Sequence, residues 1–346
     1  GTLTADGGEN SFLSQAGIGG GDDQSGGTIT INGGTVNATG VGYMGTAGAG
    51  IGGGGNGAGG KITINGGTVT AKGGDVGGAG IGGGSDGGAG GEITITGGTV
   101  NATGSGSQYT SAGAGIGGGA GGDAGKITIT GGSVTATGGS LSSPLSGAGI
   151  GGGIGGGSGT FSTEANGCAV IFASSISDND NTTDWRGVIF QGQTGAVYGA
   201  NIAPIEDFTI SEEYELTIEN GKTLTISADI TLTNDGTIVN NGTIDGTVSG
   251  TGNVLADTYY LDTDNGRKDQ QANLVTPGST AWTGNNPDGG WYVVTGDVTI
   301  GQRVTVNGNV HLILADGCNL TVNGGINVSE GNSLTIYAQS TGKDMG

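Results

Sequence analysis

The sequence is poor in the residues that build enzyme active sites and ordinary globular cores. Its 346 residues include one histidine, two cysteines, four prolines and nine lysines plus arginines, and only 5% are aromatic. So few prolines beside 87 glycines exclude a collagen-like sequence or a proline-rich linker. With 32% hydrophobic residues the chain cannot fill two conventional globular cores, so its apolar residues must form a thin, continuous file.

Long apolar runs and positive charge are also missing. No stretch approaches the length of a membrane span and no secretory signal is present, so membrane insertion is not expected, and we interpret the chain as a mature fragment. A formal charge of −21 would repel a phosphate backbone, so nucleic acid is not an expected partner. The acidic surface could attract cations or basic partners, although keeping a long solenoid soluble explains it more simply.

The two cysteines, Cys168 and Cys318, each follow a turn and open an apolar stretch. We predict two small inward core residues rather than a disulfide, because a solenoid should hold them several coils apart.

Five copies of Ala-Gly-Ile-Gly-Gly-Gly dominate the first half of the chain. They begin at Ala16, Ala49, Ala79, Ala114 and Ala148, so successive copies lie 33, 30, 35 and 34 residues apart. After each of the first four come a glycine-rich turn, a strand-like tetrad such as Lys61 to Ile64, a Gly-Gly pair, a second strand and a loop of variable length. Ile and Val alternate with Thr, Lys and Glu in these strands, the pattern of a strand buried on one face. Each unit therefore predicts one coil of a solenoid, with glycine corners that accept positive φ.

From Gly167 onward the glycine density falls, but short strands separated by Asn-Gly and Asp-Gly turns continue almost to the end. We predict an all-β, right-handed parallel β-helix of about a dozen coils. Residues 1–165 form its Gly-rich repeat region and residues 166–346 continue the helix. The segment 259–290 interrupts the rhythm and predicts a lateral loop or a kink. Packed polyglycine helices are a weaker alternative, because the Thr-Ile-Thr-Ile tetrads need ladder partners.

The two ends of the chain read as neighbours. Residues 334–346 followed by residues 1–5 would make a continuous strand, turn and strand. We therefore expect one period of a longer array, or end-to-end self-association into filaments. A uniformly monomeric protein in light scattering over a wide concentration range would argue against such association.

Catalytic residues are not expected. His311 alternates with inward apolar residues, which favours an outward, solvated position. Scarce Lys and Arg argue against polysaccharide lyase chemistry. An acidic cluster could supply a glycoside hydrolase pair, although a solvated loop is the simpler interpretation; it comprises Glu206, Asp207, Glu212, Glu213 and Glu215.

Two candidate binding sites remain. Oxygen ligands at alternate positions make calcium the one candidate cofactor, at Asp178, Asp180 and Asp184 and again at Asp262 and Asp264, although solvated turns are the simpler interpretation of both. The other candidate is a sugar-stacking site, since aromatic rings flank a polar loop, with a core plug as the alternative; its residues are Trp282, Asn285, Asn286, Trp291 and Tyr292.

The Gly-Ala-Gly-Ile-Gly-Gly-Gly and Ile-Thr-Ile-Thr-Gly-Gly-Thr-Val units resemble Gly-rich β-solenoid surface proteins of Gram-positive gut bacteria, as do residues 169–176, 187–192 and 236–244. The resemblance covers nearly the whole chain and implies secretion, wall attachment and adhesin-like or carbohydrate-binding roles. It supplies no catalytic residue, because the shared motif is architectural, and no wall-sorting motif occurs. We therefore expect a non-enzymatic extracellular scaffold or adhesin on the cell surface or wall, with glycans or host and bacterial surface proteins as partners. A carbohydrate-binding module and a polysaccharide-active β-helix enzyme are the alternatives.

Overall fold

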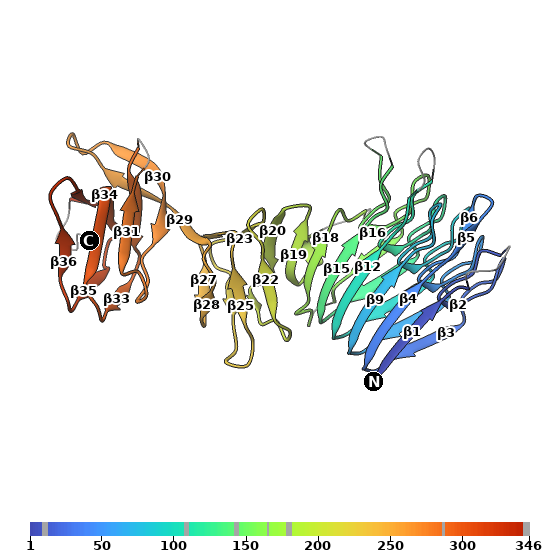
Figure 1. Cartoon of the computed structure of the whole chain (residues 1–346). Helices are drawn as coiled ribbons and strands as arrows, with labels where there is room; N and C mark the ends of the chain where they lie inside the picture. The colour runs from blue at the N-terminus through green and yellow to red at the C-terminus, as the bar shows by residue number, and fades with distance from the viewer. Residues whose placement is uncertain are drawn as a thin grey trace. The chain divides into compact units, whose positions relative to one another are not determined.

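A computed structural model describes residues 1–8, 13–106, 111–141, 145–164, 166–177, 182–285 and 288–341. Apart from the short 3-10 helix η1 (Thr182–Asp184), its regular structure is β-strand (Figure 1). The chain divides into two compact units. Unit 1 comprises Gly1–Thr233 with Gly242–Gly250, and unit 2 comprises Asn234–Asn241 with Thr251–Gly346. Within the described residues, no helix is long and apolar enough to cross a membrane.

Unit 1 begins with a Gly-rich stack of five coils, each with three faces that we name A, B and C. Face A consists of β1 (Thr2–Asp6), β4 (Thr35–Thr39), β9 (Thr68–Lys72), β12 (Thr99–Thr103) and β15 (Ser133–Thr137). Face B consists of β2 (Ile18–Gly19), β7 (Ile51–Gly52), β10 (Ile81–Gly82), β13 (Ile116–Gly117) and β16 (Ile150–Gly151). Face C consists of β3 (Thr28–Ile31), β8 (Lys61–Ile64), β11 (Glu92–Ile95), β14 (Lys126–Ile129) and β17 (Thr160–Ser162).

Neighbouring coils pair in parallel and in a register that repeats the sequence motif. Ile81, the isoleucine of the third Ala-Gly-Ile-Gly-Gly-Gly copy, lies between Ile51 and Ile116 on face B. The same ladder of isoleucines and valines runs through faces A and C, and these side chains are buried in one core. The parallel β-helix predicted from the sequence is therefore confirmed, and each predicted unit is one coil.

The glycine triplet of the motif is required by close stacking of the backbones. Its first glycine has a φ between 134° and 147° in all five coils, a conformation that residues with a Cβ rarely adopt. Its third glycine lies directly against the coil before it: a Cβ on Gly84 would overlap the carbonyl oxygen of Gly54, and a Cβ on Gly119 that of Gly84. Glycine therefore sets the distance between coils as well as their corners.

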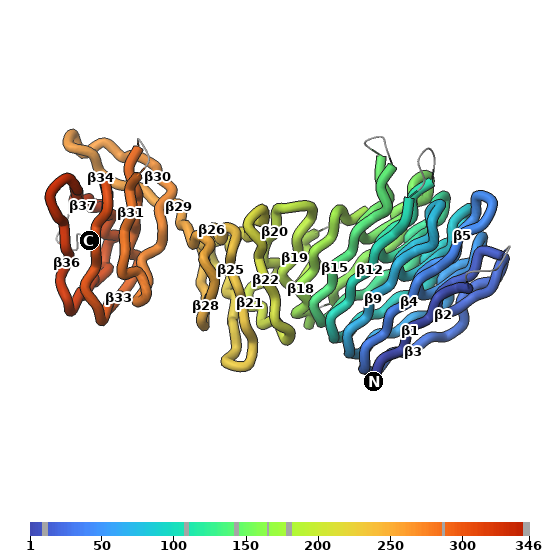
Figure 2. The backbone as a smooth tube through the Cα atoms, in the orientation of Figure 1, coloured from blue at the N-terminus to red at the C-terminus, as the bar shows by residue number. Residues whose placement is uncertain are grey.

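Beyond the Gly-rich stack the chain reverses direction. Face A continues in parallel through β18 (Val170–Ala173) and β19 (Gly187–Gln191). A tight turn then makes β20 (Thr194–Tyr198) antiparallel to β19. A second stack with shorter coils follows, as the backbone tube shows (Figure 2). Its strands within unit 1 are β21 (Asn201–Ile202), β22 (Phe208–Ile210), β23 (Glu215–Ile218), β24 (Thr223–Thr225), β25 (Leu232–Asn234, whose last residue belongs to unit 2), β27 (Thr243–Asp245) and β28 (Val248–Ser249).

The core changes sides of the sheet at this reversal. Ile189 faces the core of the Gly-rich stack, whereas Phe190 lies in one column with Gly195 and the buried Leu216 of the second stack. Val188, Ile189 and Phe190 are all buried, because β19 lies between the two cores. The hand of a coil depends on the direction of its strands and on the side of the sheet at which its core lies. Reversing the strand direction inverts the hand, and moving the core to the other side of the sheet inverts it a second time. Both stacks therefore wind with the same hand.

Unit 2 begins with β26 (Thr237–Asn240) and an antiparallel hairpin of β29 (Asn253–Leu261) and β30 (Arg267–Leu274). Parallel coils follow, formed by β31 (Ala281–Gly284), β32 (Gly290–Val294), β33 (Asp297–Ile300), β34 (Val304–Leu314), β35 (Asn319–Val322), β36 (Ile326–Val328) and β37 (Ser333–Ala338). Their core includes Val304, Val306, Val310 and Leu312 of the long strand β34.

Two expectations about organisation need adjustment. The segment 259–290 is mostly strand rather than a lateral loop or kink, and it includes a hairpin whose polar composition conceals it. The transition near residue 165 is a change of coil type inside unit 1, and the two compact units divide between residues 233 and 251.

Candidate functional site

The aromatic residues predicted to bind sugar are separated by the sheet of unit 2. Trp282 has no exposed surface and packs in the core, with the ring of Tyr292 at 5.7 Å. The Tyr292 hydroxyl accepts a hydrogen bond of 2.7 Å from the Thr283 N–H. Trp282 and Tyr292 therefore fill the core, as in the alternative to the sugar-stacking site, and Trp282 cannot stack on a ligand. Asn285 is exposed, and Asn286 lies outside the described residues.

Trp291 points to the opposite face of the sheet and joins an outer aromatic cluster with Tyr260, His311 and Tyr337. The rings of Tyr260 and His311 stack on Trp291 at 4.7 and 4.4 Å. Tyr337 Oη lies 3.2 Å from His311 Nδ1. Since Tyr260 belongs to β29, the cluster fastens the hairpin to the sheet, and its partners already occupy the Trp291 ring.

Burial is the cause of the shifted acidities in this cluster. It lowers the pKa of His311, because the imidazolium form loses solvation, and raises the pKa of Tyr337, because the phenolate does. The outward position predicted for His311 is found, but the ring is half-buried against Trp291.

One of the two predicted calcium ligands of unit 2, Asp262, stabilises a turn. Asp262 Oδ1 accepts hydrogen bonds from the N–H groups of Asp264 (3.0 Å) and Gly266 (2.8 Å), and Lys268 Nζ lies 3.6 Å from Oδ2. The hydrogen bond from Gly266 is the main cause of the lowered pKa of Asp262. These interactions fix the Asp262 carboxylate in the turn of the hairpin.

The other predicted ligands lie in unit 1. Asp184 is exposed at the end of η1, and Asp178 and Asp180 lie outside the described residues. No group of three or more His, Cys, Asp or Glu placed to hold a metal occurs in the part of the chain that the structure describes. Calcium therefore remains a prediction from the sequence alone.

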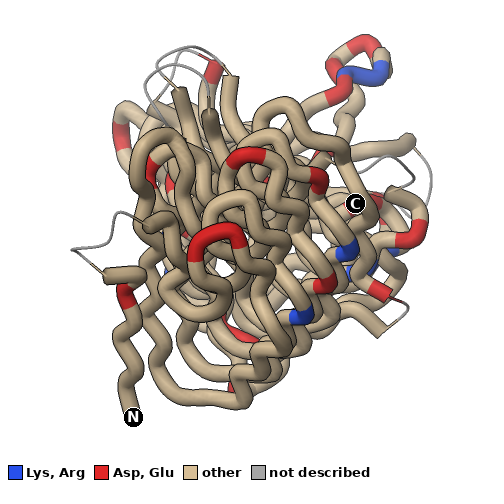
Figure 3. Tube along the Cα trace, turned by 90° about the vertical axis from the view of Figure 1, so that its right-hand side faces the viewer, with Lys and Arg blue, Asp and Glu red and all other residues tan. Residues whose placement is uncertain are grey.

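The acidic cluster of residues 206–215 does not converge on one point. Glu206 Oε1 accepts a hydrogen bond of 3.2 Å from the Gly98 N–H of the Gly-rich stack. Asp207 Oδ1 accepts one of 2.7 Å from the Thr231 N–H, and Glu213 Oε2 accepts one of 2.6 Å from Gln193 Nε2. Glu212 and Glu215 are exposed. The carboxylates of Glu206, Asp207 and Glu213 therefore join separate segments, and many of the other acidic residues lie in turns and loops (Figure 3).

Cys168 and Cys318 are free thiols, one in each unit, and both are half-buried. Burial raises the pKa of both thiols, so neither is activated as a nucleophile.

The variable segments of the Gly-rich repeats gather at the corner between faces A and B. We name the described residues 41–47, 73–78, 105–106, 111–112, 139–141 and 145–146 the corner loops. Three of them are closed by antiparallel pairs: Gly42 with Ala47, Gly106 with Ala112, and Ser140 with Ser146. Met44 in the hairpin of β5 (Gly42–Tyr43) and β6 (Thr46–Ala47) is 86% exposed. Most of the length differences between repeats in the sequence therefore lie at one edge of the stack (Figure 1), and the turn between β10 and β11 differs from its counterparts by one residue.

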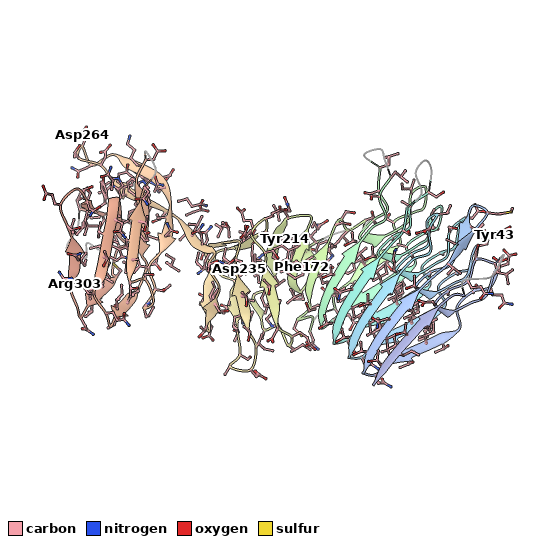
Figure 4. All side chains as sticks on the ribbon, in the orientation of Figure 1. Tyr43, Phe172, Tyr214, Asp235, Asp264 and Arg303 are labelled. Atoms are coloured by element: carbon pink, nitrogen blue, oxygen red, sulfur yellow. The ribbon has the colours of Figure 1, made fainter. Side chains whose placement is uncertain are left out.

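A groove that sequence reasoning missed lies where the second stack meets face A. Ser133 and Thr135 of β15 and Phe172 of β18 form one side, and Phe208 and Tyr214 contribute to the other. Its volume is about 520 Å³. We name it the junction groove; Figure 4 labels Phe172 and Tyr214. One signal in the sequence was available, since Val170–Ala173 and Val188–Phe190 are apolar on consecutive residues, as expected for strands buried on both faces.

Comparison with known proteins places the repeats in a family. Residues 1–22, 29–55, 62–85, 93–120 and 127–158 match the family model described as Beta helix repeat. No curated protein and no solved structure matches the chain. The five matched segments fall within the Gly-rich stack, where the parallel ladders run. The Gly-rich stack is therefore built from beta helix repeats, in agreement with its parallel β-helix fold.

Proposed function

We propose that this protein is a non-enzymatic scaffold of the cell surface, with adhesin-like binding through its corner loops. Beta helix repeats fit either a surface scaffold or a polysaccharide-related protein. The observation that favours the scaffold is that the most variable loops gather at one edge of an otherwise repetitive stack, where Met44 and Leu145 are exposed. In solenoids such an edge is often the binding face, because loops can vary there without disturbing the ladders.

The way the loops are anchored supports this proposal. The corner loops are held by backbone hydrogen bonds to adjacent coils, such as Gly74 N–H to Gly48 O (2.9 Å) and Gly139 N–H to Gly113 O (2.9 Å). Their bases are therefore fixed while apolar side chains project from two of them, with Met44 86% and Leu145 60% exposed. Rigid presentation of apolar side chains lowers the entropy lost on binding.

A polysaccharide-active enzyme is the competing function, and one assay on the full chain separates the two. Arrays of glycans and of host and bacterial surface proteins would report binding, and release of reducing ends would report turnover. We expect binding without turnover. Release of reducing ends by the wild-type protein would overturn the scaffold function.

Loop variants locate the binding surface. Met44→Asp and Leu145→Asp place a charge on two corner loops, and Thr30→Asp places one on an exposed position of face C. We expect the two loop variants to weaken binding about tenfold, which corresponds to about 1.4 kcal/mol, and Thr30→Asp to leave it unchanged. Equal binding by all three variants would contradict a role of the corner loops. Labelling of intact cells with an antibody tests the surface location.

A further inference from the structure

The junction groove lies at a boundary between two kinds of surface. Along one column of face A, the exposed Asn101 and Thr135 are followed by Phe172 and then by the buried Phe190. The outer face therefore changes from hydroxyl and amide groups to aromatic rings within two strands. This change occurs where the second stack begins to cover the face, so the last aromatic ring on the open side, Phe172, stays half-buried.

Aromatic rings give the groove a firm apolar wall. Phe172 stacks on Phe190 with ring centroids 4.6 Å apart, and Tyr214 meets Phe172 edge-on at 5.6 Å. The backbone of Tyr214 is fixed in a turn by a hydrogen bond of 2.8 Å from its N–H to Ser211 O. These rings are held in place before any ligand arrives, which reduces the entropy lost on binding.

The remaining lining consists mostly of hydroxyl groups that the protein itself does not use. Within the described structure, the side-chain hydroxyls of Ser133, Thr135, Thr209 and Tyr214 make no hydrogen bond to another protein group, although all four residues line the groove. Hydroxyls beside an aromatic wall suit a ligand that has both apolar C–H faces and many hydroxyl groups. That combination is the chemistry of a pyranose sugar.

Charge narrows the class of sugar. The described residues that line the groove include no Lys or Arg, and Asp207 is their one charged side chain. A phosphate, sulfate or uronate group would find no cation to pair with and would be repelled by Asp207. The ligand should therefore be uncharged.

The length of the surface favours a chain over a single sugar. The groove opens onto face A, where Thr99, Asn101, Thr68 and Thr70 present further hydroxyl and amide groups on successive strands. Such strands are spaced about 4.8 Å apart, so the polar groups repeat along the axis of the stack. We propose that the junction groove of unit 1 binds a neutral polysaccharide, with the sugar rings against Phe172 and Tyr214. This site is separate from the corner loops and does not depend on the scaffold function.

A matched pair of variants on one strand tests the site. Thr135→Lys places a long side chain in the groove, and Thr137→Lys places the same side chain two residues further along β15, outside the groove. Both threonines are exposed, and the column of Thr137 already contains Lys72 in another coil, so both variants should fold. Thermal unfolding checks that they do.

Affinity electrophoresis of the full chain would use gels with galactomannan, xyloglucan or a soluble β-1,3-glucan as neutral probes, and polygalacturonate as the anionic probe. We expect at least one neutral probe to retard the protein, Thr135→Lys to weaken that binding about tenfold or more, and Thr137→Lys to leave it within about twofold. Tyr214→Ala should weaken binding and Tyr214→Phe less so, because the ring supplies most of the contact. Met44→Asp should leave it unchanged, which separates this site from the corner loops.

Three results would overturn the proposal. The first is the absence of retardation by every neutral probe. The second is equal binding by Thr135→Lys, Thr137→Lys and the wild type, and the third is a preference for polygalacturonate.

Discussion

At the scale of single residues, the glycines of the repeat are of two kinds. At some, a neighbouring backbone leaves no room for a Cβ atom, and at others a Cβ atom would face open space. Gly84 is of the first kind, since its own Cβ would overlap Gly54 O. Gly27 is of the second kind, because no atom lies within 4 Å of the place that a Cβ would take and its φ is not positive.

We expect Gly84→Ala to lower the free energy of unfolding of unit 1 by about 2–3 kcal/mol, because two backbones would have to separate. Gly27→Ala should be neutral or raise it by about 0.4–1 kcal/mol, because alanine restricts the unfolded chain. Denaturant unfolding followed by circular dichroism measures both. A Gly84→Ala protein as stable as Gly27→Ala would show that glycine does not set the coil spacing.

The sequence predicted inward and outward positions well where one face of a strand is buried, as in Lys61 to Ile64, because a period of two is a direct signal. It did not separate Trp282 and Tyr292, which pack in the core, from Trp291 on the opposite face. The direction of each side chain depends on the register of β31 and β32 against β34, which is a tertiary property.

At the scale of elements, the hairpin of β19 and β20 connects two cores through one strand. Phe190 is fully buried and stacks on Phe172, and a Cβ on Gly195 would collide with its ring. The ring therefore fills the start of the second core while Ile189 fills the end of the first.

We expect Phe190→Ala to lower the free energy of unfolding of unit 1 by about 3–5 kcal/mol, through lost burial and the cavity left behind. Phe190→Leu should cost less, about 1.5 kcal/mol, because it keeps much of the volume. Urea unfolding of the two variants provides the comparison. If Phe190→Ala lost less free energy of unfolding than Phe190→Leu, the second core would not depend on this ring.

The hairpins themselves could not be predicted from the periodic pattern. Residues 187–198 contain short strand signals like those of the parallel rungs, and only the turn at Gly192 distinguishes reversal from continuation. The sequence predicted the variable loops of the Gly-rich repeats but not the corner at which they gather. The junction groove was missed for a related reason, since it is formed by segments distant in sequence that pairing brings together.

At the scale of the whole molecule, each unit has hydrophobic clusters of its own, so the two should unfold in separate steps. His311 is the only histidine and lies in unit 2, and burial lowers its pKa. The unfolded chain then binds the proton more readily than the folded one. The stability of unit 2 is therefore full above the ordinary histidine pKa of about 6.5 and is lost as pH falls through that value toward the folded pKa.

We expect calorimetry to show two transitions, of which the transition of unit 2 moves to lower temperature between about pH 7.5 and about pH 5.5. His311→Gln should remove most of this movement. The pKa of Asp262 is lowered from an already acidic value, so this carboxylate does not titrate in the same window. A single transition, or equal pH dependence in His311→Gln, would contradict this account.

The reversal at β19 and β20 also solves a problem that near-identical coils create for themselves. Because faces A, B and C carry almost the same residues in every coil, a slip by one whole coil would preserve most side-chain matches. A hairpin joins strands that are adjacent in sequence, so its pairing has no equivalent elsewhere in the stack. The hairpin therefore gives the stack one fixed register, and a slip of the coils on one side of it does not change the pairing on the other side.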